Sequence, residues 1–304
     1  HTSGSTGTPK PMQVEKERMM ASARLTCSFL GLKEGDSALL CMPLQYIAGK
    51  MVVVRSLVAG LKLIPIAPCG HPLKDLKEAP TFAAMIPMQV YNTLQEPEER
   101  EKLMGIKHLI IGGGAIDDAL GKALKDFPNH VWSTYGMTET LSHIALRRLN
   151  GAEASEWYTP FDNVRIRLSE EGTLIIHAPN VCAEELITND IAEINQEGKF
   201  RIIGRKDNTI NSGGVKIQIE QVEAALKGHL KFPFLITARK DIKFGEIVVL
   251  LYNKVEDGAF IRQVCESTLP TYWVPKVYIG VDELPMTGTG KPDRASARRM
   301  ANNQ

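Results

Sequence analysis

The chain has 304 residues, of which 36 are lysine or arginine and 35 are aspartate or glutamate, and 43% of its residues are hydrophobic. This length suits two domains with a sizeable core, and the balanced charge, with no basic stripe that contains aromatic residues, excludes nucleic acid as an expected partner. The longest apolar stretch, residues 51–67, is interrupted by Arg55 and Lys62 and is too short between these charges to span a bilayer. We therefore expect a soluble protein without a membrane span.

The cysteines indicate a reducing compartment. They are odd in number, scattered, and never arranged as a C-x-x-C pair, which argues against a disulfide framework or a zinc site. They are Cys27, Cys41, Cys69, Cys182 and Cys265. We expect a cytoplasmic protein. Because the chain opens at His1 without an initiator methionine and no strand precedes its first motif, we also expect that an N-terminal portion of the natural protein is missing.

The first motif, residues 2–11, predicts an oligophosphate site. Its glycines let the backbone approach a ligand closely, its hydroxyl and N–H groups donate hydrogen bonds, and Lys10 adds a positive charge. A Walker A loop is excluded, because only two residues separate Gly4 from Gly7 and Pro11 follows the lysine. A flexible glycine- and serine-rich linker is the alternative. The candidate ligand-binding residues are Thr2, Ser3, Gly4, Ser5, Thr6, Gly7 and Lys10.

Apolar spacing and turn residues predict alternating helices and strands as far as residue 134. Helices are expected over 12–30, over 47–57, after Pro87 and over 117–126, and strands over 38–44, 62–67, 81–86, 108–111 and 131–134. Repeated βα units of this kind predict a layered α/β domain. The glycines at 112–114 follow one of these strands, but Asp117 stands where a dinucleotide-binding loop needs its third glycine.

The second strong motif is Tyr-Gly-Met-Thr-Glu at residues 135–139. Tyr135 offers a flat ring for a base, Gly136 permits a sharp turn, Thr138 can bind a phosphate oxygen, and Glu139 can hold a magnesium ion. A strand that runs into an ordinary turn would explain the glycine but not the threonine and glutamate after it. His143 follows without an H-E-x-x-H pattern, so it is a candidate for lining a pocket and not a metal ligand.

The remainder of the chain changes pattern twice. Alternating apolar runs over 164–203, separated by turns at 170–172 and 196–198, predict an accessory antiparallel β unit. Beyond it, helices over 220–227 and 258–269 and strands over 234–239, 246–251 and 276–280 predict a compact α+β domain. We place the domains at residues 1–206 and 207–304.

In this order, the motifs resemble those of the adenylate-forming superfamily, which contains acyl-CoA synthetases, peptide-synthetase adenylation domains and luciferases. The resemblance spans essentially the whole chain, through the segments 2–11, 112–115, 135–139, 188–190, 204–207, 211–217 and 284–294. It implies a layered α/β domain with a small mobile C-terminal domain. It also implies an acid–thiol ligase that uses ATP, Mg²⁺ and coenzyme A, forms an acyl adenylate with release of pyrophosphate, and then forms a thioester.

The resemblance further implies a role for each matching residue. Adenine would pack on the glycine turn, the ribose hydroxyls would bind an aspartate, and a lysine near the C-terminus would be catalytic together with Thr138 and Glu139. Adenine would be bound by Gly113, Gly114 and Ala115, the ribose hydroxyls by Asp190, and ribose or phosphate by Arg205. Asp207 would be the hinge, Gly213 and Gly214 would leave room for the pantetheine arm, and Lys291 would be the catalytic lysine. Asn189 replaces the glycine usual before the aspartate, and because asparagine tolerates positive φ we expect the turn to survive. A solvated turn acid and an exposed surface lysine are the alternatives for Asp190 and Lys291.

Within the superfamily, residues 43–50, Arg55 and residues 138–145 resemble the o-succinylbenzoate-CoA ligases of menaquinone synthesis. Their substrate carries a second carboxylate, which an arginine facing the pocket would suit; a surface arginine on an apolar helix is the alternative. The expected acid pocket comprises Tyr46, Arg55, Gly136, Met137 and His143. Three other functions stay open: a fatty or aryl acyl-CoA ligase, an adenylation domain that loads a carrier protein, and a non-catalytic nucleotide-binding module.

Overall fold

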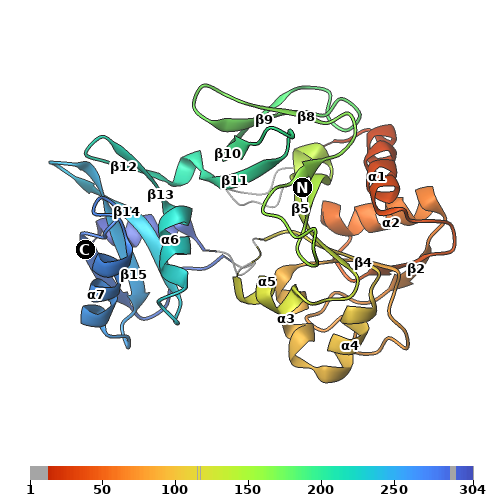
Figure 1. Ribbon diagram of the computed structural model, residues 1–304, viewed down its shortest axis with the longest axis horizontal. Coiled ribbons are helices and arrows are strands. Elements are labelled where there is room, and N and C mark those ends of the chain that lie inside the picture. The colour runs from red at the N-terminus through yellow and green to blue at the C-terminus, as the bar shows by residue number, and fades with distance from the viewer. Residues whose placement is uncertain (1–12, 115, 117, 288–291, 304) are drawn as a thin grey trace. The chain divides into compact units, whose positions relative to one another are not determined.

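The computed structural model describes residues 13–114, 116, 118–287 and 292–303, and its chain divides into two compact units (Figure 1). The first unit holds the described residues up to Arg167 together with Ile175–Ile187 and Ile194–Arg201. The second holds Leu168–Leu174, Thr188–Glu193 and the chain from Ile202. The expected domain boundary after residue 206 stays a prediction.

The first unit is built on a seven-stranded sheet with the order β2-β1-β3-β4-β5-β6-β7. Its first five strands in the chain pair in parallel, and the last two pair antiparallel. The strands are β1 (Ser37–Leu40), β2 (Lys62–Pro65), β3 (Phe82–Met85), β4 (His108–Ile111), β5 (His130–Gly136), β6 (His143–Arg148) and β7 (Thr159–Pro160). The parallel βα architecture expected from the sequence is confirmed.

Helices cover both faces of this sheet. The first pair, α1 (Lys16–Leu30) and α2 (Ile47–Ala59), lies on one face, and α3 (Pro87–Gln95), α4 (Pro97–Gly105) and α5 (Asp118–Leu124) lie on the other (Figure 1). Because successive strand residues point to opposite faces, Ala38 and Leu40 join the core under the first pair, whereas Leu39 joins the core under the other three helices. The result is a three-layer sandwich.

Two local features differ from the prediction. The segment after Pro87 forms two helices, because Glu96 takes an extended backbone before Pro97, which begins α4. Strand β5 extends to Gly136, two residues further than expected, and pairs with β6, which the sequence analysis did not anticipate.

Gly136 lies where the register between β5 and β6 shifts. A Cβ atom there would stand 2.3 Å from the carbonyl oxygen of Ser142 and 2.4 Å from Cα of His143. Because backbone atoms cannot yield as a flexible side chain can, Gly136→Ala should lower the free energy of unfolding by about 1–3 kcal/mol or more. Urea unfolding would measure it. Gly121→Ala is the control: it lies inside α5 with nothing within 4 Å of the added atom, so it should stabilise by up to ~1 kcal/mol. Equal effects would contradict the steric argument.

The four-stranded sheet that follows has the order β11-β10-β9-β8, and the boundary between the two units runs through its strands. They are β8 (Arg165–Leu168), β9 (Thr173–His177), β10 (Leu186–Ile194) and β11 (Phe200–Arg205). Gly172 and Gly198 have positive φ in the short turns that connect β8 to β9 and β10 to β11. The accessory β unit expected from the sequence is therefore present.

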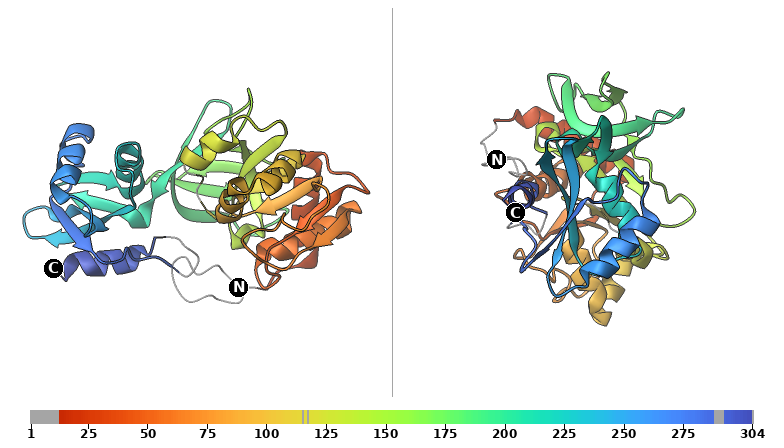
Figure 2. Two further views of the ribbon diagram at one scale, coloured as in Figure 1. Left: turned by 90° about the horizontal axis from the view of Figure 1, so that it is seen from below. Right: turned by 90° about the vertical axis from the view of Figure 1, so that its left-hand side faces the viewer.

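The C-terminal part of the second unit has a five-stranded sheet with the path β13-β12-β15-β14 and with β16 parallel to β15. Helices α6 and α7 cover one face, and α8, which the sequence analysis missed, covers the other (Figure 2). The elements are β12 (Thr209–Ser212), β13 (Val215–Gln218), α6 (Ile219–Lys227), β14 (Phe234–Asp241), β15 (Gly245–Asn253), α7 (Gly258–Thr268), β16 (Val277–Val281) and α8 (Arg294–Asn302). Among the helices described, none has the length and apolar character that a membrane span requires.

Candidate active site

Two predicted motifs of the first unit, at residues 112–114 and 135–139, lie at one edge of the seven-stranded sheet. Strands β1, β3, β4 and β5 are parallel neighbours, so the segments that follow them meet at the carboxyl ends of the strands. The sheet order also reverses there, because the chain leaves β1 for β2 on one side and returns to β3 on the other. Ligands of open α/β sheets bind at such an edge, near the point of reversal.

The glycine turn after β4 packs closely against β5 and the start of α3 and leaves little room for side chains. A Cβ at Gly112 would come within 2.5 Å of Oγ1 of Thr134, and one at Gly114 within 3.3 Å of Cγ of Pro87. Gly113 has a φ of 77°, which side chains rarely allow. The turn therefore presents bare backbone between β5 and the start of α3, as a flat ligand surface requires. Ala115 lies outside the described residues.

The Tyr-Gly-Met-Thr-Glu segment is held by local contacts. The Tyr135 ring meets Phe200 edge-on, with 5.0 Å between ring centroids. Met137 precedes the short 3-10 helix η1 (Thr138–Thr140), and Thr140 Oγ1 accepts a hydrogen bond from the Met137 N–H at 3.1 Å. Glu139 is exposed on η1. The segment thus combines a fixed backbone with an accessible carboxylate.

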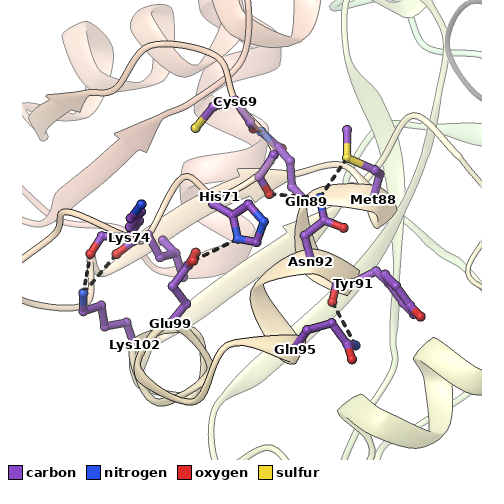
Figure 3. Close-up of polar contacts among 12 residues, drawn as sticks. Cys69, His71, Lys74, Met88, Gln89, Tyr91, Asn92, Gln95, Glu99 and Lys102 are labelled. Carbon is purple, nitrogen blue, oxygen red and sulfur yellow. Dashed lines mark hydrogen bonds and ion pairs between the residues drawn. The ribbon is translucent and has the colours of Figure 1, made fainter.

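Side chains of α3 and α4 fix the neighbouring loops (Figure 3). Gln89 Nε2 donates to the carbonyl oxygens of Cys41 and Cys69 at 3.2 and 2.9 Å, so it holds the end of β1 against the loop after β2. Lys102 Nζ donates to two further carbonyl oxygens of that loop, those of residues 73 and 74. These hydrogen bonds fix the position at which the segment between β1 and α2 leaves the sheet. That segment ends at the half-exposed Tyr46.

Arg55 is buried, so the surface-arginine alternative was wrong. It lies on α2 with 2% of its surface exposed, and its Nη2 donates to Ser142 Oγ at 2.6 Å. Its Nε is buried and has no hydrogen-bond partner among the described residues. Within that part of the chain no carboxylate pairs with it, and burial raises the pKa of the neighbouring Cys27 thiol, which is therefore neutral at pH 7. A buried cation without an anion is costly to maintain.

The free-energy cost of burying the Arg55 cation appears as a lowered pKa. Burial lowers the pKa of Arg55 to about 10, against a small opposing effect of Cys27. At neutral pH the arginine stays charged, and this shift corresponds to roughly 3 kcal/mol of lost stability for the folded protein. A bound carboxylate would recover part of that energy, so the arginine is suited to bind an anion.

A chain of hydrogen bonds holds Ser142 in place. Its Oγ lies 3.2 Å from His143 Nδ1, His143 Nε2 lies 3.0 Å from Thr26 Oγ1, and Thr26 donates to the carbonyl oxygen of Ser22. Since Arg55 can only donate, Ser142 directs its proton to Nδ1, and His143 Nε2–H donates to Thr26. The chain is satisfied by one neutral tautomer. Burial, and secondly Arg55, keeps the pKa of His143 well below its usual 6.5.

His143 is 7% exposed and lies behind Ser142, and its assignment to the lining of the acid pocket stays a prediction. Ser142 was within a motif that the sequence analysis quoted, but it received no role, and Thr26 appeared only as a position on a helix. Helical spacing alone offered no signal for either residue, because their importance arises from contact between α1, α2 and the start of β6.

Acid should destabilise the first unit through its neutral histidines. Burial is the main cause that lowers the pKa of His108 to about 4, and the pKa of His143 is also lowered. The unfolded chain then binds more protons than the folded one below pH 6.5, so stability falls as pH falls. From pH 7 to pH 5, His108 alone should cost about 2 kcal/mol in urea unfolding. His108→Gln should flatten the profile; a profile as steep as that of the wild type would refute this reading.

The ribose and hinge candidates cluster within the second unit. Arg205 donates from Nη1 to Asp190 Oδ1 at 3.1 Å and from Nη2 to Asp207 Oδ2 at 2.9 Å. These acids outweigh burial, the largest single influence, and raise the pKa of Arg205. The expected turn at Asn189 is wrong: the residue lies inside β10 and its φ is not positive. A strand places Asp190 here, so no glycine conformation is required.

The remaining candidates have simpler placements. Gly213 and Gly214, with φ of 58° and 84°, form the two-residue turn between β12 and β13, which by itself accounts for glycine at both positions. The phosphate-loop residues 2–7, Lys10 and Lys291 lie outside the described residues.

The fold and these motifs define a class of protein. The profile of the family described as AMP-binding enzyme matches residues 1–186, and the chain belongs to this family. The solved structure of an acyl-CoA synthetase (AMP-forming)/AMP-acid ligase II-like protein from Dyadobacter fermentans is 35% identical, with 97% of this chain and 87% of that one covered and a TM-score of 0.67.

Two relatives that carry a more specific name are similar over nearly the whole of this chain. The 2-succinylbenzoate–CoA ligase of Bacillus mycoides (strain KBAB4) is 26% identical over 336 residues, which cover 99% of this chain and 69% of the relative. The o-succinylbenzoate CoA synthetase of Bacillus subtilis, solved with its acyl-adenylate intermediate, shares the fold with a TM-score of 0.81 at 23% identity, over 97% of this chain and 67% of that one.

Proposed function

We propose that this protein is an ATP-dependent acid:CoA ligase whose acid is o-succinylbenzoate, as in menaquinone synthesis. The family and the named relatives support the reaction class. The observation that carries the choice of acid is Arg55, a buried arginine with no carboxylate partner in the described chain. A substrate with a second carboxylate would supply that partner through a bidentate, charge-assisted pair.

In the proposed reaction, the substrate carboxylate attacks the α-phosphorus of ATP, and an acyl adenylate and pyrophosphate are formed. The thiol of coenzyme A then attacks the acyl carbon and AMP leaves. Both steps gather negative charge on oxygen, which preorganised donors and cations stabilise. We assign the stabilisation of that charge to the phosphate-loop residues 2–7 and Lys10, and to Thr138 and Lys291.

Nucleotide binding is assigned to the two clusters described above. The bare glycine turn with Gly113 and Gly114, together with Ala115 and Tyr135, is assigned to adenine, and Asp190 with Arg205 is assigned to the ribose. The exposed carboxylate of Glu139 fits Mg²⁺, which is usually bound by one or two carboxylates together with substrate phosphates. When bound, the ion supplies neutralising charge to the phosphates.

The second half-reaction requires space for the thiol. We assign Asp207 as the hinge about which the C-terminal domain turns, so that Lys291 withdraws and Gly213 with Gly214 leaves room for the pantetheine arm. The contacts of Asp207 with Arg205 support this assignment, because a pivot next to the ribose candidate can respond to the nucleotide.

Pyrophosphate release with a panel of acids, with and without coenzyme A, tests the proposal. We expect o-succinylbenzoate to be preferred, with release of AMP dependent on coenzyme A. Preference for a fatty acid or a plain benzoate would favour another acyl-CoA ligase. Transfer to a carrier protein instead of coenzyme A would favour an adenylation domain. Nucleotide binding without pyrophosphate release under any condition would indicate a non-catalytic module.

Asp190→Ala should weaken ATP binding and leave the fold intact. Each charge-assisted hydrogen bond to ribose contributes about 1.5–3 kcal/mol, so the Kd for ATP, measured by calorimetry, should rise by roughly ten- to a hundredfold for each of the two bonds lost. Asp207→Ala is the matched control, because it also removes a partner of Arg205 but no ribose contact. Equal effects of both variants would show that Asp190 acts only through Arg205.

A further inference from the structure

A groove of about 340 Å³ lies at the opposite edge of the seven-stranded sheet from the candidate active site. Its polar wall contains His108 and His130, which begin β4 and β5, and Arg148, which ends the antiparallel strand β6. The end of α1 forms the other wall. Along β5, Trp132 of the groove lies three residues from Tyr135 of the Tyr-Gly motif, ~10 Å at 3.3 Å per residue, and the two side chains point to opposite faces of the sheet. A ligand here would not contact the adenylation site.

Two buried nitrogen atoms of the lining residues have no hydrogen-bond partner in the described part of the chain. They are His108 Nδ1 and Trp132 Nε1. His108 is 5% exposed, and a buried polar group normally finds a partner because leaving it unpaired is costly. Indole N–H can only donate, so at least one of the two groups requires an acceptor. Both atoms belong to side chains that line the groove.

Aromatic rings surround these nitrogen atoms. The ring of Trp132 meets Phe29 edge-on at 5.2 Å between centroids and His130 at 6.2 Å, and His130 meets His108 at 5.4 Å. Perpendicular rings of this kind leave faces and edges for a further flat group, which aromatic pairs favour in offset or edge-on geometry. The groove therefore suits a planar ligand.

The groove contains one cation, Arg148, and one anion, Glu153. Arg148 stacks over the Trp132 ring at 5.1 Å, and its side chain is 11% exposed. Its ion-pair partner, Glu153, lies at the long distance of 3.8 Å and is 81% exposed, so solvent screens the pair. His108 and His130 are neutral at pH 7, because burial and nearby cations lower the pKa of each. Arg148 Nε donates to Asn150 Oδ1 at 2.8 Å, so the exposed pair with Glu153, made through Nη1, is the part of its bonding that a ligand can displace.

We propose that this groove is a second, non-catalytic binding site for a small aromatic carboxylate. The carboxylate pairs with Arg148 in place of Glu153, the ring packs among Phe29, His130 and Trp132, and a small shift of the Trp132 ring brings its buried Nε1–H to the carboxylate as donor. The site does not depend on the proposed acid substrate, because it uses none of the residues assigned to catalysis.

Benzoate is the probe, added to the full-length chain labelled with ¹⁵N. The indole signal of Trp132, assigned with Trp132→Phe, reports on this groove and not on the acid pocket. We expect benzoate to move this signal downfield with saturation, and inorganic phosphate and benzyl alcohol to bind at least about tenfold more weakly. Equal binding of phosphate would show an adventitious anion site and would overturn the aromatic part of the proposal.

Two variants test how the charges of Arg148 and Glu153 affect benzoate binding. Arg148→Met should weaken benzoate binding about tenfold or more, the usual effect of losing a charge-assisted contact. Glu153→Gln should tighten it by up to about fivefold, because it removes the competing anion from an exposed position where folding is not at risk. Arg55→Ala should leave the Trp132 response unchanged.

The proposal fails if Arg55→Ala abolishes the Trp132 response, or if Glu153→Gln has no effect or weakens binding. Should Arg148→Met not fold, Glu153→Gln and the comparison with phosphate decide the question. Pyrophosphate release by Glu153→Gln should match the wild type, so failure of the proposed ligase function would appear in that assay and failure of this site would appear in the Trp132 signal.

Discussion

Arg55→Met is expected to lower kcat/KM for o-succinylbenzoate by roughly thirty- to a few thousandfold and, at the same time, to stabilise the folded protein. Truncating a buried partner of a carboxylate costs about 2–5 kcal/mol, at ~1.4 kcal/mol per tenfold change. Stability should rise by about 1–3 kcal/mol, because an apolar side chain of similar length replaces a buried cation that has no anion in the described chain. Ser142 keeps its hydrogen bond to His143, so the substitution leaves no new unpaired group there.

The two effects can be separated. Kinetics should be compared for o-succinylbenzoate and a substituted benzoate that lacks the second carboxylate, and unfolding should be measured in urea. Arg24→Met, on the exposed face of α1, is the control and should change neither quantity. Equal losses on both acids would mean that Arg55 does not bind the second carboxylate, and a generic acyl-CoA ligase would then describe the protein better.

Lys291→Ala is expected to abolish detectable pyrophosphate release while thioester formation from a supplied acyl adenylate continues. The reason is that a cation which neutralises the α-phosphate in the transition state raises the rate of adenylation alone. Each half-reaction is measured separately, the first by pyrophosphate release and the second by thioester formation.

Lys254→Ala removes another lysine of the second unit, one whose exposed side chain pairs with Asp282, and should leave both half-reactions unchanged. If Lys291→Ala slows the two half-reactions equally, the lysine supports the structure or binds substrate throughout, and its assignment to adenylation is wrong.

The order of the elements in the first unit was predictable from the sequence. Residues 108–111 form a short apolar run next to glycines, and such a run suits a strand buried on both faces of a parallel sheet. Parallel pairing then brings the segments after β4 and β5 to one edge, so two motifs more than 20 residues apart in the chain become neighbours. Residue chemistry and spacing were sufficient for that part of the site.

Helix α2 shows what local pattern could not decide. Arg55 is buried while Leu57, two residues further, is 79% exposed, the reverse of what hydropathy suggests. The buried face comprises Met51, Val52, Arg55 and Ser56, which follow helical spacing. In a helix that is apolar nearly all round, the sequence does not say which face packs inward, and contact with α1 and β6 makes the choice.

The same distinction holds for single polar groups. The sequence by itself determined the order of the βα elements and of the motifs, because periodicity and residue chemistry are local properties of the chain. Tertiary structure alone decided that His143 would be neutral behind Ser142, that Asp190 would lie on a strand, and that Trp132 Nε1 would be buried without a partner in the described chain. Protonation, burial and hydrogen bonding depend on neighbours brought together from distant parts of the chain, and no periodicity records them.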